Sequence, residues 1–341
     1  MLLPLPEVEE RTVTRRKLVI PLATAVALSM GATIAVCKGS AGVMLGAHVG
    51  RQYDPTWQAD FEALERAIGR KLAIDNDQED WAVMPNTSRI NWDIRNRRMP
   101  MISWTVSNHK SDPAAGCATA DAILTGSYDR QFEKQAAAVK AFGAPILVRF
   151  NYEMTGNEAA GCFTGFEVRE NPSLAGSKYV SVWKHVVDKF RAAGASNAKW
   201  VWAPGHKAYE TGEWRLFYPG NAYVDWVAVD DYNKSDTARS FAADPGINAF
   251  YRTASGMGKP LMIAETGAVS DPTQNPDPQT LWLTTARIYL KTHPAIKAFV
   301  WWNNPGKLSR EDPEYGGSGY VLQGPGLAAF RAMANDPYFQ Q

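Results

Sequence analysis

Residues 145–156 read Pro-Ile-Leu-Val-Arg-Phe-Asn-Tyr-Glu-Met-Thr-Gly. The stretch begins as an apolar run with β-branched residues and ends in polar ones, which is typical of a buried parallel strand that reaches the open edge of its sheet. Period-two alternation places Arg149, Asn151 and Glu153 on one face. Because α/β barrels hold their reactive groups at the carboxyl ends of strands, we predict that Glu153 stands at the mouth of a barrel.

The rest of the chain repeats this arrangement. Residues 260–267 read Pro-Leu-Met-Ile-Ala-Glu-Thr-Gly, with Glu265 at the matching place. Amphipathic helices that end at glycine alternate with short apolar strands, which predicts β-α units and a parallel sheet. No Gly-x-Gly-x-x-Gly motif follows a strand, which disfavours a nucleotide-binding open sheet. We predict an α/β fold, a (β/α)8 TIM barrel over residues 41–338, with strands at residues 42–47, 71–75, 100–104, 145–150, 199–202, 226–229, 260–264 and 297–301.

The N-terminal segment, residues 1–40, is predicted to lie outside the barrel. Arg15, Arg16 and Lys17 precede an uncharged, largely apolar run over residues 18–37. A basic stretch followed by an apolar one is typical of an export signal, and the run is nearly long enough to be an uncleaved membrane anchor. In either case the positive flank stays inside. We therefore expect the protein to be secreted or anchored to the outer face of the cytoplasmic membrane.

Composition narrows the class of partner. The formal net charge is +1, which argues against a nucleic-acid-binding protein, since these carry a basic excess. The chain contains 12 Trp and 13 Tyr, and aromatic rings stack on sugar rings but also fill cores. Its five histidines are scattered, with no His-Glu-x-x-His motif or Cys/His cluster, so we expect no catalytic metal and no cofactor.

Two carboxylates on facing strand ends suit the cleavage of a glycosidic bond. A retaining mechanism needs carboxyl groups about 5–5.5 Å apart, and Glu153 and Glu265 end the fourth and seventh strands of the predicted barrel. Arg149, lower on the same strand as Glu153, is placed to support a carboxylate from below. Tyr232 is placed to hydrogen-bond a nucleophile and hold it ionised.

Several other side chains at strand ends are candidates for contact with a sugar. Trp104, Trp202 and Trp301 each end a strand, where they would either floor a sugar subsite or plug the barrel; we favour Trp301 for substrate. His48, at the end of the first strand, is either a substrate contact or a buried histidine.

Two cysteines remain outside the export segment. Cys117 and Cys162 both lie in loop sequence rich in Gly and Ala. In an exported protein such a pair is a candidate disulfide, and two free thiols are the alternative.

Four strings identify a family resemblance in chain order: R-F-N-Y-E-M-T-G, Y-P-G-N-A-Y-V-D-W-V-A-V-D-D-Y, K-P-L-M-I-A-E-T-G and K-A-F-V-W-W-N. They resemble glycoside hydrolase family 26, over roughly residues 40–335. The resemblance implies a (β/α)8 barrel and retaining, endo-acting cleavage of β-linked polysaccharide, mostly β-1,4-mannan. It implies that Glu153 is the acid/base, Glu265 the nucleophile, Tyr232 the tyrosine beside it, and Trp301 the tryptophan beneath the sugar at the cleavage point.

Two departures from the family pattern bear on the substrate. Tyr152 stands where the family usually has His, which changes the expected substrate-side hydrogen bonds. Thr155 replaces Asn, and no Trp follows it. Alternatives to a mannanase are therefore a β-1,4- or mixed-linkage glucanase, a transglycosylase of surface polysaccharide, and a non-catalytic glycan-binding barrel. We expect a monomer whose partner is the polysaccharide, with membrane contact only through the N-terminal segment and only if that segment is not cleaved.

Overall fold

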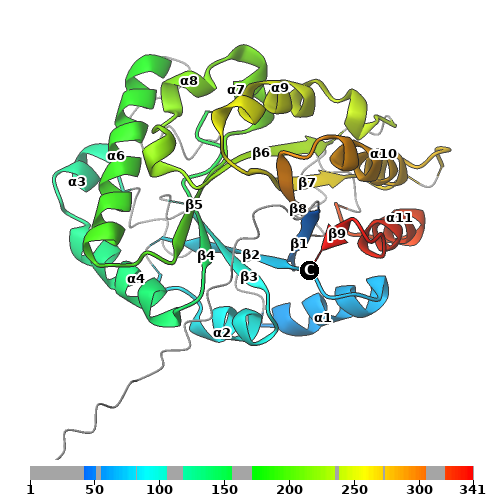
Figure 1. Cartoon of the computed structure of the whole chain (residues 1–341), viewed down its shortest axis with the longest axis horizontal. Helices are drawn as coiled ribbons and strands as arrows, with labels where there is room; N and C mark the ends of the chain where they lie inside the picture. The colour runs from blue at the N-terminus through cyan, green and yellow to red at the C-terminus, as the bar shows by residue number, and fades with distance from the viewer. Residues whose placement is uncertain are drawn as a thin grey trace, which may run out of the picture. The chain divides into compact units, whose positions relative to one another are not determined.

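The computed structural model describes residues 42–50, 55–81, 83–105, 118–155, 171–234, 238–271, 273–304 and 319–340. Within them, parallel strands are joined in the order β2-β3-β4-β5-β6-β7-β8-β1, and β1 also pairs with β2, which closes the sheet into a barrel. Figure 1 shows the helices arranged around these strands. The predicted (β/α)8 barrel is confirmed.

All eight predicted strands are present, and a short ninth strand pairs with β1. The strands are β1 (Val43–Val49), β2 (Ile74–Asp80), β3 (Met99–Thr105), β4 (Ile146–Phe150), β5 (Ala198–Trp202), β6 (Trp226–Asn233), β7 (Leu261–Ala268), β8 (Ile296–Asn303) and β9 (Phe339–Gln340).

Strand β2 differs from its prediction, because it starts three residues later and continues to Asp80. Its sequence, Ile-Asp-Asn-Asp-Gln-Glu-Asp, looks like a loop because it is so polar. The strand forms because Arg89 of the following helix neutralises its outward-facing acids: the guanidinium binds Asp75 at 2.8 and 2.6 Å and Asp77 at 2.8 Å. Buried charges are tolerated when they are paired in this way.

Helices follow most of the strands, and several end where glycine was expected to end them. Gly69 and Gly143 take left-handed φ angles of 75° and 69° at the ends of α1 and α4. The α-helices are α1 (Trp57–Ile68), α2 (Thr87–Arg95), α3 (Ala120–Leu124), α4 (Asp129–Phe142), α6 (Pro172–Ala192), α7 (His206–Thr211), α8 (Trp214–Phe217), α9 (Pro245–Ala254), α10 (Pro278–Thr292) and α11 (Gly324–Ala334). Among the residues described, no helix has both the length and the apolar character needed to cross a membrane.

The core has two layers, one on each face of the closed sheet. The larger layer packs between strands and helices, and a smaller one fills the barrel interior with residues such as Met101, Leu147, Ala228 and Met262. Each large apolar side chain buried in this way contributes about 1.5–3 kcal/mol. The inner layer fills the barrel below its mouth, and a cluster of polar groups lies above it, at the carboxyl ends of the strands.

Three predictions concern residues outside the described ranges. Residues 1–40, expected to be an export signal or anchor, lie there, and so do Cys117 and Cys162. The division of the chain after residue 40 and the disulfide stay predictions.

Candidate active site

The backbone after β4 turns instead of continuing as a strand. Asn151 and Glu153 take positive φ angles of 44° and 51°, a left-handed conformation that L residues seldom adopt. Their amides are fixed to neighbouring strands, by Asn151 N–H donating to Trp104 O at 2.7 Å and Glu153 N–H donating to Ala203 O at 2.9 Å. The predicted alternation from Arg149 to Glu153 was therefore wrong, because the strand ends at Phe150. Glu153 instead lies in a turn after β4, whose backbone is hydrogen-bonded to Trp104 of β3 and to Ala203, the residue after β5.

Three carboxyl groups meet at the mouth of the barrel. Glu153, Asp230 and Glu265 each place one oxygen within 4.8 Å of the others. Asp230 and Glu265 are paired neighbours in the β6–β7 register, while Glu153 reaches them from the end of β4. This proximity matches the separation of about 5–5.5 Å between carboxyl groups that a double-displacement reaction at a glycosidic bond requires.

Arg149 supports this cluster from inside the barrel. Its side chain is fully buried, and its two terminal nitrogens donate separately to Glu265 Oε1 and Asp230 Oδ2. It also donates to Ser103 Oγ at 3.2 Å. Burial alone would lower the pKa of Arg149, but the charges of Asp230 and Glu265 raise it, so the guanidinium stays charged. The structure thus places Arg149 beneath Glu265, as the sequence predicted.

Tyr232 lies on the other side of Glu265. Its hydroxyl donates to Glu265 Oε2 at 2.6 Å, and burial raises its pKa well above the ordinary value, so it remains a donor. Both oxygens of Glu265 therefore accept hydrogen bonds, one from a cation and one from a phenol. These two charge-assisted hydrogen bonds fix the orientation of the Glu265 carboxyl group at the mouth of the barrel.

Glu153 lies in surroundings that favour its protonated form. Burial and the nearby charge of Glu265 raise its pKa to about 7, although Arg149 and Lys234 act in the other direction. When two neighbouring carboxyl groups lie in different surroundings, one can act as a proton donor and the other as a nucleophile.

Asp230 was not predicted as a site residue, although it is central to the cluster. It is 1% exposed, and burial, followed by the charge of Glu265, raises its pKa well above the ordinary value, with Arg149 opposing the shift. The signal was present in Val-Asp-Asp-Tyr, because alternation along β6 puts Asp230 on the same face as Tyr232.

The model of glycosyl hydrolase family 26 matches residues 45–269. The chain belongs to glycosyl hydrolase family 26. The resemblance read from the sequence strings is thereby confirmed.

Two curated relatives match part of the chain. Endoglucanase H of Acetivibrio thermocellus is 28% identical over 277 residues, which is 77% of this chain and 28% of that protein. Mannan endo-1,4-beta-mannosidase of Bacillus subtilis is 28% identical over 132 residues, 38% of this chain and 32% of that protein. The matched region is thus about a third or less of each relative's length.

Solved structures support the fold. The GH26 beta-mannanase of Bacteroides ovatus superposes with a TM-score of 0.61 at 17% identity, covering 88% of this chain and 90% of that one. The catalytic domain of the GH26 endo-beta-1,4-mannanase of Bacillus sp. JAMB-750 gives a TM-score of 0.64 at 14% identity, covering 88% and 87%. At these identities the likeness shows the barrel fold alone.

The three strand-end tryptophans do not lie at the mouth of this family 26 barrel. Trp104, Trp202 and Trp301 are each 0% exposed and pack in the outer layer, against helices. Trp202 Nε1 donates to Phe217 O at 3.1 Å, and Trp301 Nε1 donates to Tyr320 O at 2.9 Å. The prediction that Trp301 lies under a sugar was therefore wrong. For Trp104 and Trp202 the sequence left a subsite and a barrel plug as alternatives, and the structure places both residues outside the barrel instead.

Trp302 occupies the inward position next to Trp301. It is half-buried, and its ring stacks on His48 with centroids 3.9 Å apart and an interplanar angle of 11°. The error arose because adjacent residues of a strand face opposite sides of the sheet. Of the two neighbouring tryptophans, Trp301 therefore faces the helices and Trp302 faces the barrel mouth.

His48 is the buried histidine that the sequence left as one of two readings. It is 1% exposed, and its Nδ1 lies 2.8 Å from Asn76 O. Burial, with the charge of Arg89, lowers its pKa to about 4, so Nδ1–H donates to the carbonyl and the neutral ring backs Trp302.

Tyr152 lies beside Glu265 and contacts a residue that the sequence did not single out, Gln78. Gln78 of β2 donates from Nε2 to the Tyr152 hydroxyl at 2.8 Å, and the same nitrogen lies 3.5 Å from Glu265 Oε1. The Arg149 guanidinium lies 3.9 Å from the centre of the Tyr152 ring. Tyr152 and Gln78 thus form one wall of the site next to Glu265. Only the closed barrel brings residues 74 positions apart together.

The carboxyl cluster is also the only group of three or more possible metal ligands within the described part of the chain. Arg149 already supplies a positive charge to two of its three members. The expectation of no metal and no cofactor stays a prediction.

Proposed function

We propose that this chain is an endo-acting glycoside hydrolase that cleaves a β-linked polysaccharide with retention of configuration, β-1,4-mannan first among the substrates. The observation that carries the proposal is the meeting of Glu153 and Glu265 within 4.8 Å at the barrel mouth, one with a raised pKa and the other held by Arg149 and Tyr232. Membership of family 26 supports the same reaction class.

The proposed reaction has two steps. In the first, Glu153 donates its proton to the glycosidic oxygen while Glu265 attacks the anomeric carbon to form a glycosyl-enzyme ester. Esterification removes the negative charge of Glu265, which is one of the causes of the raised pKa of Glu153. The pKa of Glu153 then falls, so in the second step Glu153 can accept a proton from the water that hydrolyses the ester.

A glucan is the second candidate substrate. The relative named endoglucanase H aligns with 77% of this chain, whereas the one named for mannan aligns with 38%. The wall made by Tyr152 and Gln78 adds a phenol hydroxyl and an amide to the site, and these groups read sugar hydroxyls differently from the histidine of the family pattern. We therefore propose β-1,4- or mixed-linkage glucan as the alternative to mannan.

A substrate panel tests the proposal. The purified protein is incubated with mannan, mixed-linkage glucan, xylan and cellulose, and viscosity is followed together with reducing ends. An endo-acting enzyme lowers viscosity early, and proton NMR shows the β-anomer of the new end first. Products longer than the supplied oligosaccharide would indicate a transglycosylase, and binding without cleavage a glycan-binding barrel. An α-anomer as first product would contradict the retaining mechanism.

The pH profile follows from the raised pKa of Glu153. Its protonated form performs the first step, so kcat/KM is expected to be high below about pH 7 and to fall as the pH rises through that value. The measurement is kcat/KM on the cleaved polysaccharide from about pH 5 to pH 9. The Glu153→Gln variant, assayed on an aryl glycoside with a good leaving group, should lack this basic limb. A wild-type profile that is flat over this range would contradict the assignment.

The neighbouring tryptophans provide a matched pair of variants. Trp302→Ala should raise KM about tenfold and leave stability nearly unchanged, because a half-buried ring that faces the mouth is lost from substrate contact. Trp301→Ala should instead cost about 3–5 kcal/mol of unfolding free energy, since it leaves a cavity in the core. Steady-state kinetics of both variants measure KM, and urea denaturation measures their unfolding free energies. The reverse pattern would show that Trp301 serves the substrate.

We also propose that the protein acts outside the cytoplasm as a monomer, because its substrate is a polymer that does not cross membranes and residues 1–40 have the pattern of an export segment. N-terminal sequencing of the mature protein shows whether this segment is cleaved, and mass spectrometry with and without reduction tests the Cys117–Cys162 pair.

A further inference from the structure

A buried acid lies directly behind the site. Along β6, Asp230 and Tyr232 point inward to Arg149 and Glu265, and the residue between them, Asp231, points the other way. Asp231 is 1% exposed, so its carboxyl group lies between the barrel wall and the helices. It takes no part in the proposed reaction, and a buried carboxyl group is costly unless its surroundings use it.

The first partner of Asp231 is a second carboxyl group. Asp244, at the start of α9, accepts from the amides of Gly246 at 2.8 Å and Ile247 at 3.1 Å through Oδ1. Its carboxyl group is hydrogen-bonded to that of Asp231, and burial together with this contact raises the pKa of Asp231 well above its ordinary value. Burial and the neighbouring carboxyl group of Asp244 therefore both favour the protonated form of Asp231.

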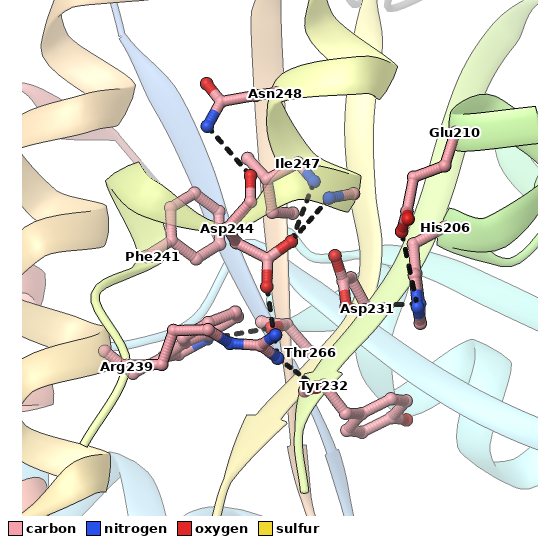
Figure 2. A network of polar contacts seen from close by, with 12 residues as sticks. His206, Glu210, Asp231, Tyr232, Arg239, Phe241, Asp244, Ile247, Asn248 and Thr266 are labelled. Atoms are coloured by element: carbon pink, nitrogen blue, oxygen red, sulfur yellow. Dashed lines mark hydrogen bonds and ion pairs between the residues drawn. The ribbon is translucent and has the colours of Figure 1, made fainter. Parts of the chain in front are cut away.

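The pair is connected to the site through Arg239. Its Nη2 lies 3.1 Å from Asp244 Oδ2, and the same nitrogen donates to the backbone carbonyl of Tyr232 at 3.3 Å. Figure 2 shows this arrangement, with Asp244 between Arg239 and Asp231 and with Tyr232 on the strand beside them. A cation fixed by a buried carboxylate thus holds the peptide group from which the Tyr232 side chain extends.

The other side of Asp231 is closed by His206 and a glycine. His206 Nδ1 lies 3.2 Å from Asp231 Oδ1, and Glu210 lies 3.7 Å from the other ring nitrogen (Figure 2). Burial lowers the pKa of His206, which leaves a neutral ring able to donate from Nδ1. A Cβ atom at Gly246 would lie only 2.5 Å from Asp231 Oδ2, so α9 approaches this closely because residue 246 has no side chain.

We propose that Asp231 is a positioning residue: with Asp244 and Arg239 it fixes the backbone at Tyr232 and so keeps the tyrosine hydroxyl on Glu265. This inference depends on the proposed function, in which Glu265 is the nucleophile. The tyrosine hydroxyl reaches Glu265 at 2.6 Å, and a shift of about 1 Å in a group that orients the reacting atoms can cost about 100-fold in rate.

A double-mutant cycle with Tyr232→Phe tests the proposal. Asp231→Leu keeps the side-chain size but removes the hydrogen bonds, and we expect kcat to fall roughly 10–100-fold with KM changed less than about threefold. Asp231→Asn should stay within about threefold of wild type, because its amide keeps a donor and an acceptor of the same size beside Asp244 and His206. In the Tyr232→Phe background, Asp231→Leu should change kcat by less than about threefold, since no hydroxyl remains to be positioned.

The assays use β-1,4-mannan, or mixed-linkage β-glucan if only that is cleaved, well below the melting temperature of each variant. If Asp231→Leu does not fold, Arg239→Met enters the same cycle, because it removes the contact with the Tyr232 carbonyl from a partly exposed position. Equal losses in both tyrosine backgrounds, or no loss from Asp231→Leu, would overturn the positioning role. Full activity of Glu265→Gln would instead overturn the proposed function, so the two failures are distinguishable.

Discussion

Replacing Glu265 with glutamine is expected to lower kcat/KM for the cleaved polysaccharide by a factor of about 10⁴ or more. Glutamine has nearly the same shape, but its neutral amide cannot form the glycosyl ester on which the second step depends. The side-chain oxygen can still accept from Arg149 or Tyr232, so the melting temperature should change little. Steady-state kinetics and thermal unfolding of the same preparation measure both quantities.

Glu62→Gln is the matched control for this prediction. Glu62 lies on α1 in an exposed ion pair with Arg66 at 3.8 Å, and it should leave activity unchanged. A Glu265→Gln variant that keeps more than about a tenth of wild-type activity would rule out Glu265 as the nucleophile.

Arg149→Met is expected to cost about 3–5 kcal/mol of unfolding free energy, as much as the loss expected for Trp301→Ala. The guanidinium has no exposed side-chain surface and pairs with Asp230 and Glu265, both of which would be left buried without their cation. Methionine fills similar space, so the loss reflects unpaired charge rather than a cavity. Urea denaturation at neutral pH measures it.

The sign of the pH dependence gives a second check on Arg149→Met. Without Arg149, burial raises the pKa of Asp230 further, because the guanidinium opposes that shift in the wild type. The folded variant is thus least penalised at low pH, where the carboxyl is protonated, and loses stability as the pH rises. Arg66→Met, which removes only an exposed pair, should cost less than about 1 kcal/mol at any pH. Similar losses from both variants would contradict the argument.

The sequence predicted those parts of the fold that depend on local pattern. Apolar runs located all eight barrel strands, and glycine marked the ends of α1 and α4. Strand β2 was placed too early because its acids look solvated in sequence. Only the packed structure brings Arg89 against Asp75 and Asp77 and makes a polar strand stable.

The site was predictable where chemistry and strand position coincide. Glu153, Glu265, Arg149 and Tyr232 follow or end apolar runs, and the structure brings all four together. To choose between Trp301 and Trp302, one must know which residues of β8 face the inside of the barrel. The sequence of the strand alone does not show this. Gln78 was missed because its partners, Tyr152 and Glu265, lie far away along the chain. Asp231 was missed because only the folded protein shows that its carboxyl group is buried.

The stacking of His48 on Trp302 has a consequence for where the barrel is vulnerable. These two side chains join β1 to β8, the first and last strands of the barrel. At the opposite end of β1, residues Val43 and Met44 pair with Phe339 and Gln340 of β9. Trp302, the proposed substrate contact, and His48 therefore lie across the pairing of β1 with β8 that closes the barrel. The position of Trp302 therefore depends on the pairing of β1 with β8 and β9, which lies away from the reacting carboxyl groups.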